Sequence, residues 1–371
     1  MNSRFLQTFI RKCQSMPPCD FVPKKYKGHK YEDLLAIRRQ RLSPALTTFH
    51  SKPLVIQQGH KQWLFDIDGR RYLDMFGGIC TVSVGHCHSE ITKAAVEQME
   101  TLGHVSNVYI HPKIQEYAEK LTDKLPGDLK VVYFVNSGSE ANDLAVLLAR
   151  CYTNNFEVIS LRNSYHGMTY QVMNLTATSV YRCKRDLVEP GTHFWGFEGH
   201  GIMPDVVTMA KGMGNGFPLA AVVTTAEIAN ALQKAKHFNT FGGNPVSCAV
   251  GIAVLDILEK DKLQKNSDEI GTYLLLELQK LRDEFSVVGD VRGKGLMIGV
   301  EMIDGCGSDK PSESTKMVKY WDRCKELGVL LGRGGYYGNV FRIKPPMCIT
   351  KEDAKFTVDV MRMALNEQFS Q

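Results

Sequence analysis

Lys211 is the residue best placed to do covalent chemistry. It ends the mostly apolar, β-branched run 206–210, and three glycines follow it within five residues. Such a run predicts a buried strand, and a lysine at its end would lie in apolar surroundings, where desolvation disfavours the charged amine. A neutral amine is a nucleophile that can form a Schiff base with a carbonyl cofactor. The alternative is a strand-end lysine that reaches solvent.

A phosphate site is predicted by the segment that starts at Val131. Five apolar residues, 131–135, indicate a strand, the small-residue turn 136–139 follows, and the apolar spacing from Ala141 onward predicts a helix. The free N–H groups and the positive dipole end of a helix N-terminus both favour an anion. The same Ser-Gly-Ser turn is also an ordinary helix cap, so on its own it leaves both interpretations open.

Two further glycine motifs could complete such a site. Tyr165 and His166 precede a glycine and follow the apolar stretch 158–161, and an aromatic ring beside a glycine can stack on a flat cofactor. A tyrosine in the core would explain the same pattern. Thr240 lies in the glycine turn before the helix predicted at 246–258, and that turn alone marks only the start of a helix.

In this order the motifs resemble the class III, ornithine-aminotransferase-like family of pyridoxal-phosphate enzymes, and they are most similar to its mitochondrial members that use alanine and glyoxylate. The resemblance runs from about residue 18 to the C-terminus and is supported by the stretches 63–74, 81–88 and 291–299. It implies an α/β protein of fold type I, in which a mostly parallel sheet lies between helices and a smaller α+β domain follows. It also implies pyridoxal 5'-phosphate as cofactor.

The resemblance assigns roles to individual residues. Lys211 is the expected catalytic residue and the covalent attachment point of the cofactor. The expected cofactor-binding residues are Ser137, Gly138, Ser139, Tyr165, His166, Thr240 and Lys211 itself. Thr240 is expected to reach the cofactor phosphate of a neighbouring subunit, which implies a homodimer. Arg342 is expected to pair with the substrate α-carboxylate, a role that suits the planar guanidinium group.

The interval between Gly167 and Lys211 is short for this family. Its 43 residues leave room for one βαβ unit of roughly 30 residues, whereas the family has several strands here, including one with an aspartate for the pyridinium nitrogen. The resemblance therefore implies an internal deletion near 187–191. None of the four acids in the interval fits the pyridinium role; they are Asp186, Glu189, Glu198 and Asp205. We expect a weakened electron sink and exposed sheet edges.

Composition argues against several classes of partner. The 371 residues are 43% hydrophobic with a net charge of +5, and no Lys/Arg cluster interleaves with aromatics, so we expect no nucleic acid. No apolar run reaches the roughly 18 residues of a membrane span. Ten cysteines without a Cys-x-x-Cys pair favour a reducing compartment. His86 and His88 frame one cysteine, but neighbours on a strand point to opposite faces, so we expect no metal site.

The first 19 residues have the pattern of a mitochondrial transit segment. They contain three basic residues and no acid, and their apolar residues have helical spacing: Phe5, Leu6, Phe9 and Ile10. This predicts a location in the mitochondrial matrix. A frayed basic N-terminus is the alternative.

The expected organisation has three parts after the transit segment 1–19. Residues 20–75 form an N-terminal segment with paired strands around the turn Asp68-Gly69, residues 76–258 form the internally shortened cofactor domain, and residues 261–371 form the small C-terminal domain. The last part should contain a helix with Leu274, Leu275, Leu278 and Leu281 and strands near 287–291, 296–302 and 340–343.

Two classes of function remain open from the sequence. In the first, the chain is a transaminase that acts on alanine, or a related amine, and on glyoxylate or another 2-oxo acid, and Lys211 moves the proton. A phospholyase that acts on a phosphorylated amino alcohol belongs to the same family and is the sibling interpretation. In the second, the chain is a catalytically impaired splice product or remnant that still dimerises.

Overall fold

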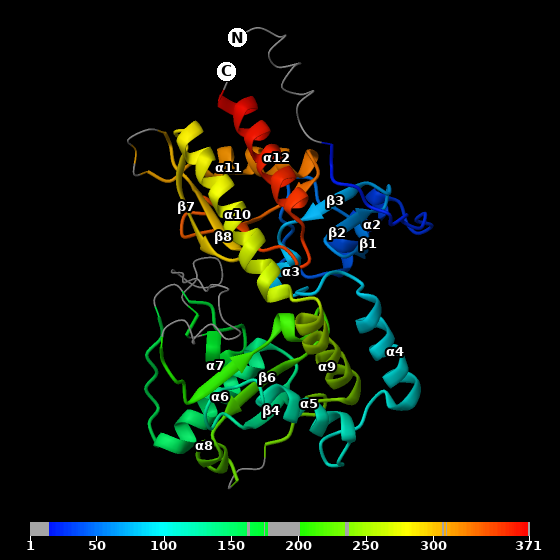
Figure 1. Cartoon of the computed structure of the whole chain (residues 1–371), viewed down its shortest axis with the longest axis vertical. Helices are drawn as coiled ribbons and strands as arrows, with labels where there is room; N and C mark the ends of the chain where they lie inside the picture. Colours follow the sequence, from blue (N-terminus) through cyan, green and yellow to red (C-terminus); the bar gives the residue numbers. More distant parts are fainter. Residues whose placement is uncertain are drawn as a thin grey trace.

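The computed structural model of the chain describes residues 15–161, 164–173, 175–176, 201–233, 237–305, 308 and 310–369. The predicted transit segment is described only from residue 15, and the predicted deletion near 187–191 lies outside the described residues. The molecule is elongated (Figure 1). The N-terminal strands and the C-terminal helices share one end, and the segment that contains α4 to α9 forms the other.

The N-terminal segment forms a small sheet against the C-terminal part. Its elements are α2 (Tyr31–Arg41), β1 (Ile56–His60), β2 (Trp63–Asp66) and β3 (Arg71–Asp74). β2 and β3 pair antiparallel, which confirms the predicted strand pair around Asp68-Gly69. The Asp66 carboxylate accepts hydrogen bonds from the N–H groups of Asp68 (3.0 Å) and Arg70 (2.9 Å) and so closes that turn. The short strand β9 (Val329–Leu330) joins β3 in parallel, so both ends of the chain build one sheet.

The middle of the chain supplies three strands, six helices and one 3₁₀ turn among the described residues. They are α4 (Ser89–Leu102), α5 (Pro112–Thr122), β4 (Val131–Val135), α6 (Gly138–Thr153), α7 (Tyr170–Met173), β5 (Val206–Met209), η2 (Lys211–Gly214), β6 (Ala220–Thr224), α8 (Ala226–Asn230) and α9 (Pro245–Lys260). The predicted helix 246–258 is confirmed as α9. Asn244 caps it by accepting a hydrogen bond from Ser247 N (3.0 Å), and Pro245 occupies the first turn.

The sheet of this region differs from the expected one. We expected mostly parallel pairing, but β6 lies between β4 and β5 and pairs antiparallel with both. β4 and β5 run in the same direction without pairing. Parallel neighbours for β5 would have to come from the interval before Lys211, most of which lies outside the described residues. Helix α6 packs on one face of the sheet, and α5 and α9 cover the other, which gives the layered α/β arrangement.

The apolar stretch 158–161, which precedes the Tyr165 motif, lies at the surface. This stretch has no regular secondary structure, and Val158, Ile159 and Leu161 are exposed. The predicted buried strand before Lys211 does form, as β5, but it is only partly buried. The exposure of both segments has one physical cause: in the described sheet β5 is an edge strand, so no strand beyond it covers its outer side or offers a partner to 158–161.

The C-terminal part is an antiparallel sheet backed by helices. Its elements are α10 (Leu263–Glu284), β7 (Val288–Lys294), β8 (Met297–Met302), α11 (Ser314–Glu326), β10 (Gly332–Gly334), β11 (Val340–Ile343) and α12 (Lys351–Phe369). The strand order is β10-β11-β8-β7. Three predicted strands are thereby confirmed. So is the predicted helix, because Leu274, Leu278 and Leu281 of α10 are fully buried, while Leu275 packs at the margin of the core.

The largest hydrophobic core joins the two ends of the chain. It contains Trp63 and Phe65 of the N-terminal sheet together with Phe341 and Ile343 of β11. In the part of the chain that the structure describes, no helix is long and apolar enough to cross a membrane.

Candidate active site

Lys211 begins a tight turn that distant residues hold in place. Its φ is +53°, a left-handed conformation that costs a non-glycine residue energy and that is enriched at functional sites. The Ser83 hydroxyl donates a 2.8 Å hydrogen bond to the carbonyl of Gly212. The Asn215 side chain accepts from Val84 N (3.0 Å) and donates to Gly85 O (3.0 Å). The turn that carries Lys211 is therefore held by the loop 83–85.

The surroundings of Lys211 differ from the expectation. We expected a desolvated amine in apolar surroundings, but Lys211 is exposed. The reason is again the position of β5 at the edge of the described sheet. The exposure of Lys211 therefore agrees with the alternative interpretation, a strand-end lysine that reaches solvent. Its role in covalent chemistry stays a prediction.

A cavity of about 330 Å³ lies between the start of α6, the loop 165–167 and the end of β5. It brings together five of the predicted site residues, Gly138, Ser139, Tyr165, His166 and Lys211. The sequence reasoning missed its other lining residues, Asn142, Gly167, Thr208, Met209 and Ala210. Asn142 could have been found, because it lies three residues after Ser139 and so on the same face of the helix.

The N-terminus of α6 provides an anion site at one end of this cavity. Ser137 is the N-cap residue, and its hydroxyl accepts a hydrogen bond from Glu140 N (3.2 Å). Ser137 does not line the cavity, so the structure supports a capping function for its side chain. The N–H groups of Gly138 and Ser139 belong to the first helical turn, where the helix itself offers no acceptor. They therefore suit a phosphate group.

The loop of Tyr165 and His166 is held against α6. Asn142 donates a 2.8 Å hydrogen bond to the carbonyl of His166. The Nδ1 atom of His166 lies 3.0 Å from the carbonyl of Leu175, which can only accept, so we assign the proton to Nδ1. Gly167 has φ +126°, and a Cβ there would lie 2.4 Å from Ser139 Oγ. Only glycine lets the loop approach the phosphate site this closely.

The cavity presents groups that suit two parts of a phosphorylated, flat cofactor. The N–H groups of Gly138 and Ser139 suit the phosphate, and Lys211 lines the same cavity. Tyr165, half exposed, lines it as well. For the ring nitrogen the described lining contains no carboxylate. That part of the cofactor has no matching group within the described residues, and three of the four acids before Lys211, Asp186, Glu189 and Glu198, lie outside them.

Thr240 lies apart from this cavity. It is exposed and does not line it, so the structure does not bring it together with the other predicted residues of the same chain. Its loop is held by Asn239, whose Oδ1 accepts hydrogen bonds from Gly242 N (2.9 Å) and Asn136 Nδ2 (3.1 Å). The ring of Phe241 lies against His104, with 5.4 Å between the ring centroids.

Arg342 lies on β11, on the face turned away from the core. Phe341 and Ile343 are buried, whereas Arg342 and Lys344 are half-buried on the opposite face. Arg342 does not line the cavity, although it lies close enough to interact with Lys344. Burial lowers the pKa of Lys344, and repulsion from Arg342 and Lys211 lowers it further, against the opposing effect of the Cys80 thiol. The sequence analysis did not single out Lys344, although the strand period places it beside Arg342.

The residues between these cationic groups form an unusual turn, α3 (Gly77–Cys80). All four have positive φ, including the β-branched Ile79 at +65°. A Cβ on Gly77 would lie 2.8 Å from the carbonyl of Lys344, so glycine is required there. The turn is thus packed between Lys344 and the Gly212 backbone.

The two histidines around Cys87 have structural partners. His86 Nε2 lies 2.7 Å from Asp74 Oδ2. The His88 side chain caps α4 by accepting a hydrogen bond from Glu90 N (3.3 Å). Each ring therefore serves the fold at a different place.

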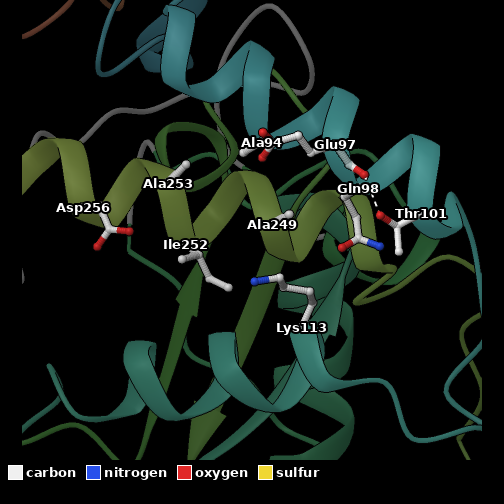
Figure 2. A pocket seen from close by; sticks show the side chains of 9 residues that line it. All are labelled: Ala94, Glu97, Gln98, Thr101, Lys113, Ala249, Ile252, Ala253 and Asp256. Atoms are coloured by element: carbon white, nitrogen blue, oxygen red, sulfur yellow. Dashed lines mark hydrogen bonds between the residues drawn. The ribbon is translucent and has the colours of Figure 1, made fainter.

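A second cavity, of about 320 Å³, lies between α4, α5 and α9 (Figure 2). Its charged lining residues are Glu97, Lys113 and Asp256, and none of the predicted site residues lines it.

Comparison with known proteins places this architecture in one family. The family model described as "Aminotransferase class-III" matches residues 47–194 and 189–365. Mitochondrial alanine–glyoxylate aminotransferase 2 of Homo sapiens is 40% identical over 460 residues, covering 95% of this chain and 90% of that protein. The mitochondrial homolog 2 of that enzyme in Arabidopsis thaliana is 38% identical, covering 95% and 91%.

Solved structures agree with this assignment. A phospholyase from Arthrobacter, in complex with phosphoethanolamine, has a TM-score of 0.82 at 28% identity and covers 90% of this chain and 99% of its own. An aminotransferase of Bacillus anthracis has a TM-score of 0.84 at 25% identity and covers 92% and 100%. The fold and site define an α/β, fold type I enzyme whose cofactor is pyridoxal 5'-phosphate. The chain belongs to the class III aminotransferases.

Proposed function

We propose that this chain transfers an amino group from alanine, or a related amine, to glyoxylate or another 2-oxo acid. The observation that carries the proposal is the cavity in which the α6 N-terminus, Tyr165, His166 and Lys211 meet. The 40% identity to an alanine–glyoxylate aminotransferase supports the choice of substrates. The phospholyase alternative is supported by the structural similarity to the enzyme complexed with phosphoethanolamine.

Each residue of the cavity has a defined task in this proposal. Pyridoxal phosphate, when bound, supplies an electron sink for the charge left at the substrate Cα after proton loss. The Gly138 and Ser139 N–H groups hold the phosphate, and the Tyr165 ring lies against the flat ring of the cofactor with His166 beside it. The Lys211 amine attaches the cofactor and moves the proton from the substrate Cα. Arg342 binds the substrate α-carboxylate.

The direct test is an assay of purified protein with pyridoxal phosphate, alanine and glyoxylate. Formation of pyruvate and glycine in equal amounts supports the transaminase. Phosphate release from phosphoethanolamine, without pyruvate from alanine, would replace it with the phospholyase. A Lys211→Ala variant serves as the control for both reactions.

A homodimer completes the proposed site. Thr240 is exposed within a surface of large apolar side chains that come from two loops, namely Val108, Tyr109, Ile110, Phe238 and Phe241. The contact between Phe241 and His104 joins these loops into one face. Contiguous exposed apolar surface is typical of an interface, and a second copy would bring Thr240 to the partner's phosphate site. Sedimentation velocity tests this: Ile110→Asp should yield monomers, and a dimer unchanged by that variant would count against this face.

We propose that the chain is imported into the mitochondrial matrix. The human and Arabidopsis relatives are named mitochondrial proteins. Residues 1–19 fused to a fluorescent protein should direct it to the matrix, and a fusion with Arg4, Arg11 and Lys12 changed to Ser should stay outside.

A catalytically impaired form is the second candidate, because four observations support a missing internal segment. The two matches to the family model overlap at 189–194, and the alignment with the human relative extends over 460 residues whereas this chain has 371. The edge of β5 and the stretch 158–161 are exposed, and the described cavity lining contains no acid. Transcript sequence across Leu187 to Gly191 tests the deletion. In the assay above, turnover comparable to that of a full-length relative would rule out impairment.

A further inference from the structure

Three cationic side chains from two parts of the chain lie within electrostatic reach of one another. Arg342 and Lys344 are two residues apart, so the strand period places them on one face of β11 and its extension, opposite the buried Ile343. Lys211 comes from a different part of the chain, just after β5. The positive charges of Arg342 and Lys211 both lower the pKa of Lys344, so the three groups interact electrostatically.

The backbone fixes this arrangement. Lys344 N donates a 2.7 Å hydrogen bond to the carbonyl of Met75, and the Lys344 carbonyl lies against Gly77. The turn then continues to Cys80, whose carbonyl lies 3.8 Å from the position of a Cβ on Gly212. Lys344 and the turn of Lys211 are therefore packed against opposite ends of one four-residue element, and their separation cannot change freely.

No acid neutralises the cluster in the described part of the chain. None of the ion pairs there involves Lys211, Arg342 or Lys344, although most surface lysines and arginines of the C-terminal sheet and helices have a carboxylate partner. Half-buried cations of like sign disfavour one another, and an anion placed among them removes that cost. In the proposed function Arg342 takes the α-carboxylate and Lys211 the cofactor, whereas Lys344 has no carboxylate partner among the described residues and interacts only with the Cys80 thiol besides these two cations.

We propose that Lys344 binds a second anionic group of the amino substrate. The preferred donor is then a related amine rather than alanine itself: an amine that carries a carboxylate or a phosphate in addition to the group bound by Arg342. This inference rests on the proposed function, because it assumes that Arg342 faces the substrate. A carboxylate and a phosphate would use the same ammonium group, so the experiment has to separate them.

The experiment uses three probes that lack an amino group and therefore cannot react with the cofactor. Propionate carries one carboxylate, succinate carries two, and phosphonopropionate carries a carboxylate and a phosphonate. Their affinities for the full-length chain are measured by calorimetry with pyridoxal phosphate present. We expect one of the two dianions to bind roughly tenfold more tightly than propionate, as one added charge contact allows. Which dianion shows the preference identifies the second group.

Variants separate this inference from the proposed function. Lys344→Met should reduce the dianion preference to about twofold or less and leave propionate unchanged, and Lys344→Arg should retain the preference. Lys319→Met, which removes an exposed charge on α11, should leave all three affinities unchanged. A wild-type chain without dianion preference, or a preference unaffected by Lys344→Met, would overturn the inference. Failure of Arg342→Ala to weaken propionate binding would instead overturn the role of Arg342.

Discussion

The Ser83 hydroxyl and the Gly212 carbonyl are joined by a 2.8 Å hydrogen bond across 129 residues of sequence. Asn215 adds two bonds to the same segment, at Val84 and Gly85. The residue that does the proposed chemistry, Lys211, is therefore positioned less by its own strand than by a loop far earlier in the chain.

Asn215→Ala should destabilise the protein, because it leaves Val84 N and Gly85 O without their partner in a part-buried turn. We expect a loss of about 1–3 kcal/mol in the free energy of unfolding, measured by urea denaturation. Asn230→Ala is the matched control, since Asn230 is exposed on α8 and should lose less than about 0.5 kcal/mol. Equal losses in the two variants would contradict the structural role of Asn215.

Lys211 should be the lysine that the cofactor modifies. Borohydride reduction of the protein with pyridoxal phosphate, followed by peptide mass spectrometry, should place the pyridoxyl group on Lys211. Lys344 is the informative internal control, because it is also a cation of the same cluster but should stay unmodified. A pyridoxyl adduct found only at other lysines would contradict the assignment of Lys211 as the residue that attaches the cofactor.

Arg342→Ala should weaken alanine or propionate binding by about 2–5 kcal/mol, the usual cost of removing one member of a desolvated charge pair. Calorimetry with propionate gives the value even when turnover is too slow to measure. Arg292→Ala, which removes an exposed arginine of β7 that pairs with Asp290 and Glu301, should leave the affinity unchanged.

Gly167→Ala should damage the phosphate end of the cavity. The added Cβ would meet Ser139 Oγ at 2.4 Å in a backbone conformation that alanine avoids. We expect a loss of about 1–3 kcal/mol in unfolding free energy and a smaller thermal shift on addition of pyridoxal phosphate. Gly338→Ala has the same type of φ, +70°, but no atom within 4 Å of the new Cβ, so it isolates backbone strain from the clash. It should leave the thermal shift intact.

Acid should destabilise the folded chain partly through His50. Burial lowers its pKa below the usual 6.5, and its hydrogen bond with Asp322 opposes this only in part. The unfolded state then binds more protons near and below pH 6.5, so stability is present above that pH and is lost as the pH falls through it. His50→Gln should flatten the fall in urea midpoint between about pH 7 and pH 5. His29→Gln, at an exposed site, should not.

Local patterns predicted the elements that rest on local contacts. The strand pair around Asp68, the leucine face of α10 and the strands of the C-terminal sheet follow from periodicity and turn residues, and all are confirmed. The cavity residues of α6 and the loop 165–167 were identified through their motifs, and the structure brings them together with Lys211.

Pairing and exposure could not be predicted in the same way. Whether β5 is a central or an edge strand depends on which other strands join the sheet, and no property of residues 206–209 carries that information. The position of Lys344 beside Lys211 likewise depends on packing through Gly77–Cys80. The turn has four left-handed residues, two of which are not glycine, so local preference argues against its conformation.

The exposed stretch 158–161 has a consequence outside catalysis. Proteases cut extended backbone, and chaperones bind exposed apolar side chains. The side chain of Ile159 is fully exposed to solvent. The amount of this protein in a cell would then be set by how fast quality-control machinery meets that stretch, rather than by the free energy of the well-packed core. Two chains with the same catalytic residues could therefore differ greatly in abundance through four residues that do not line the described cavity.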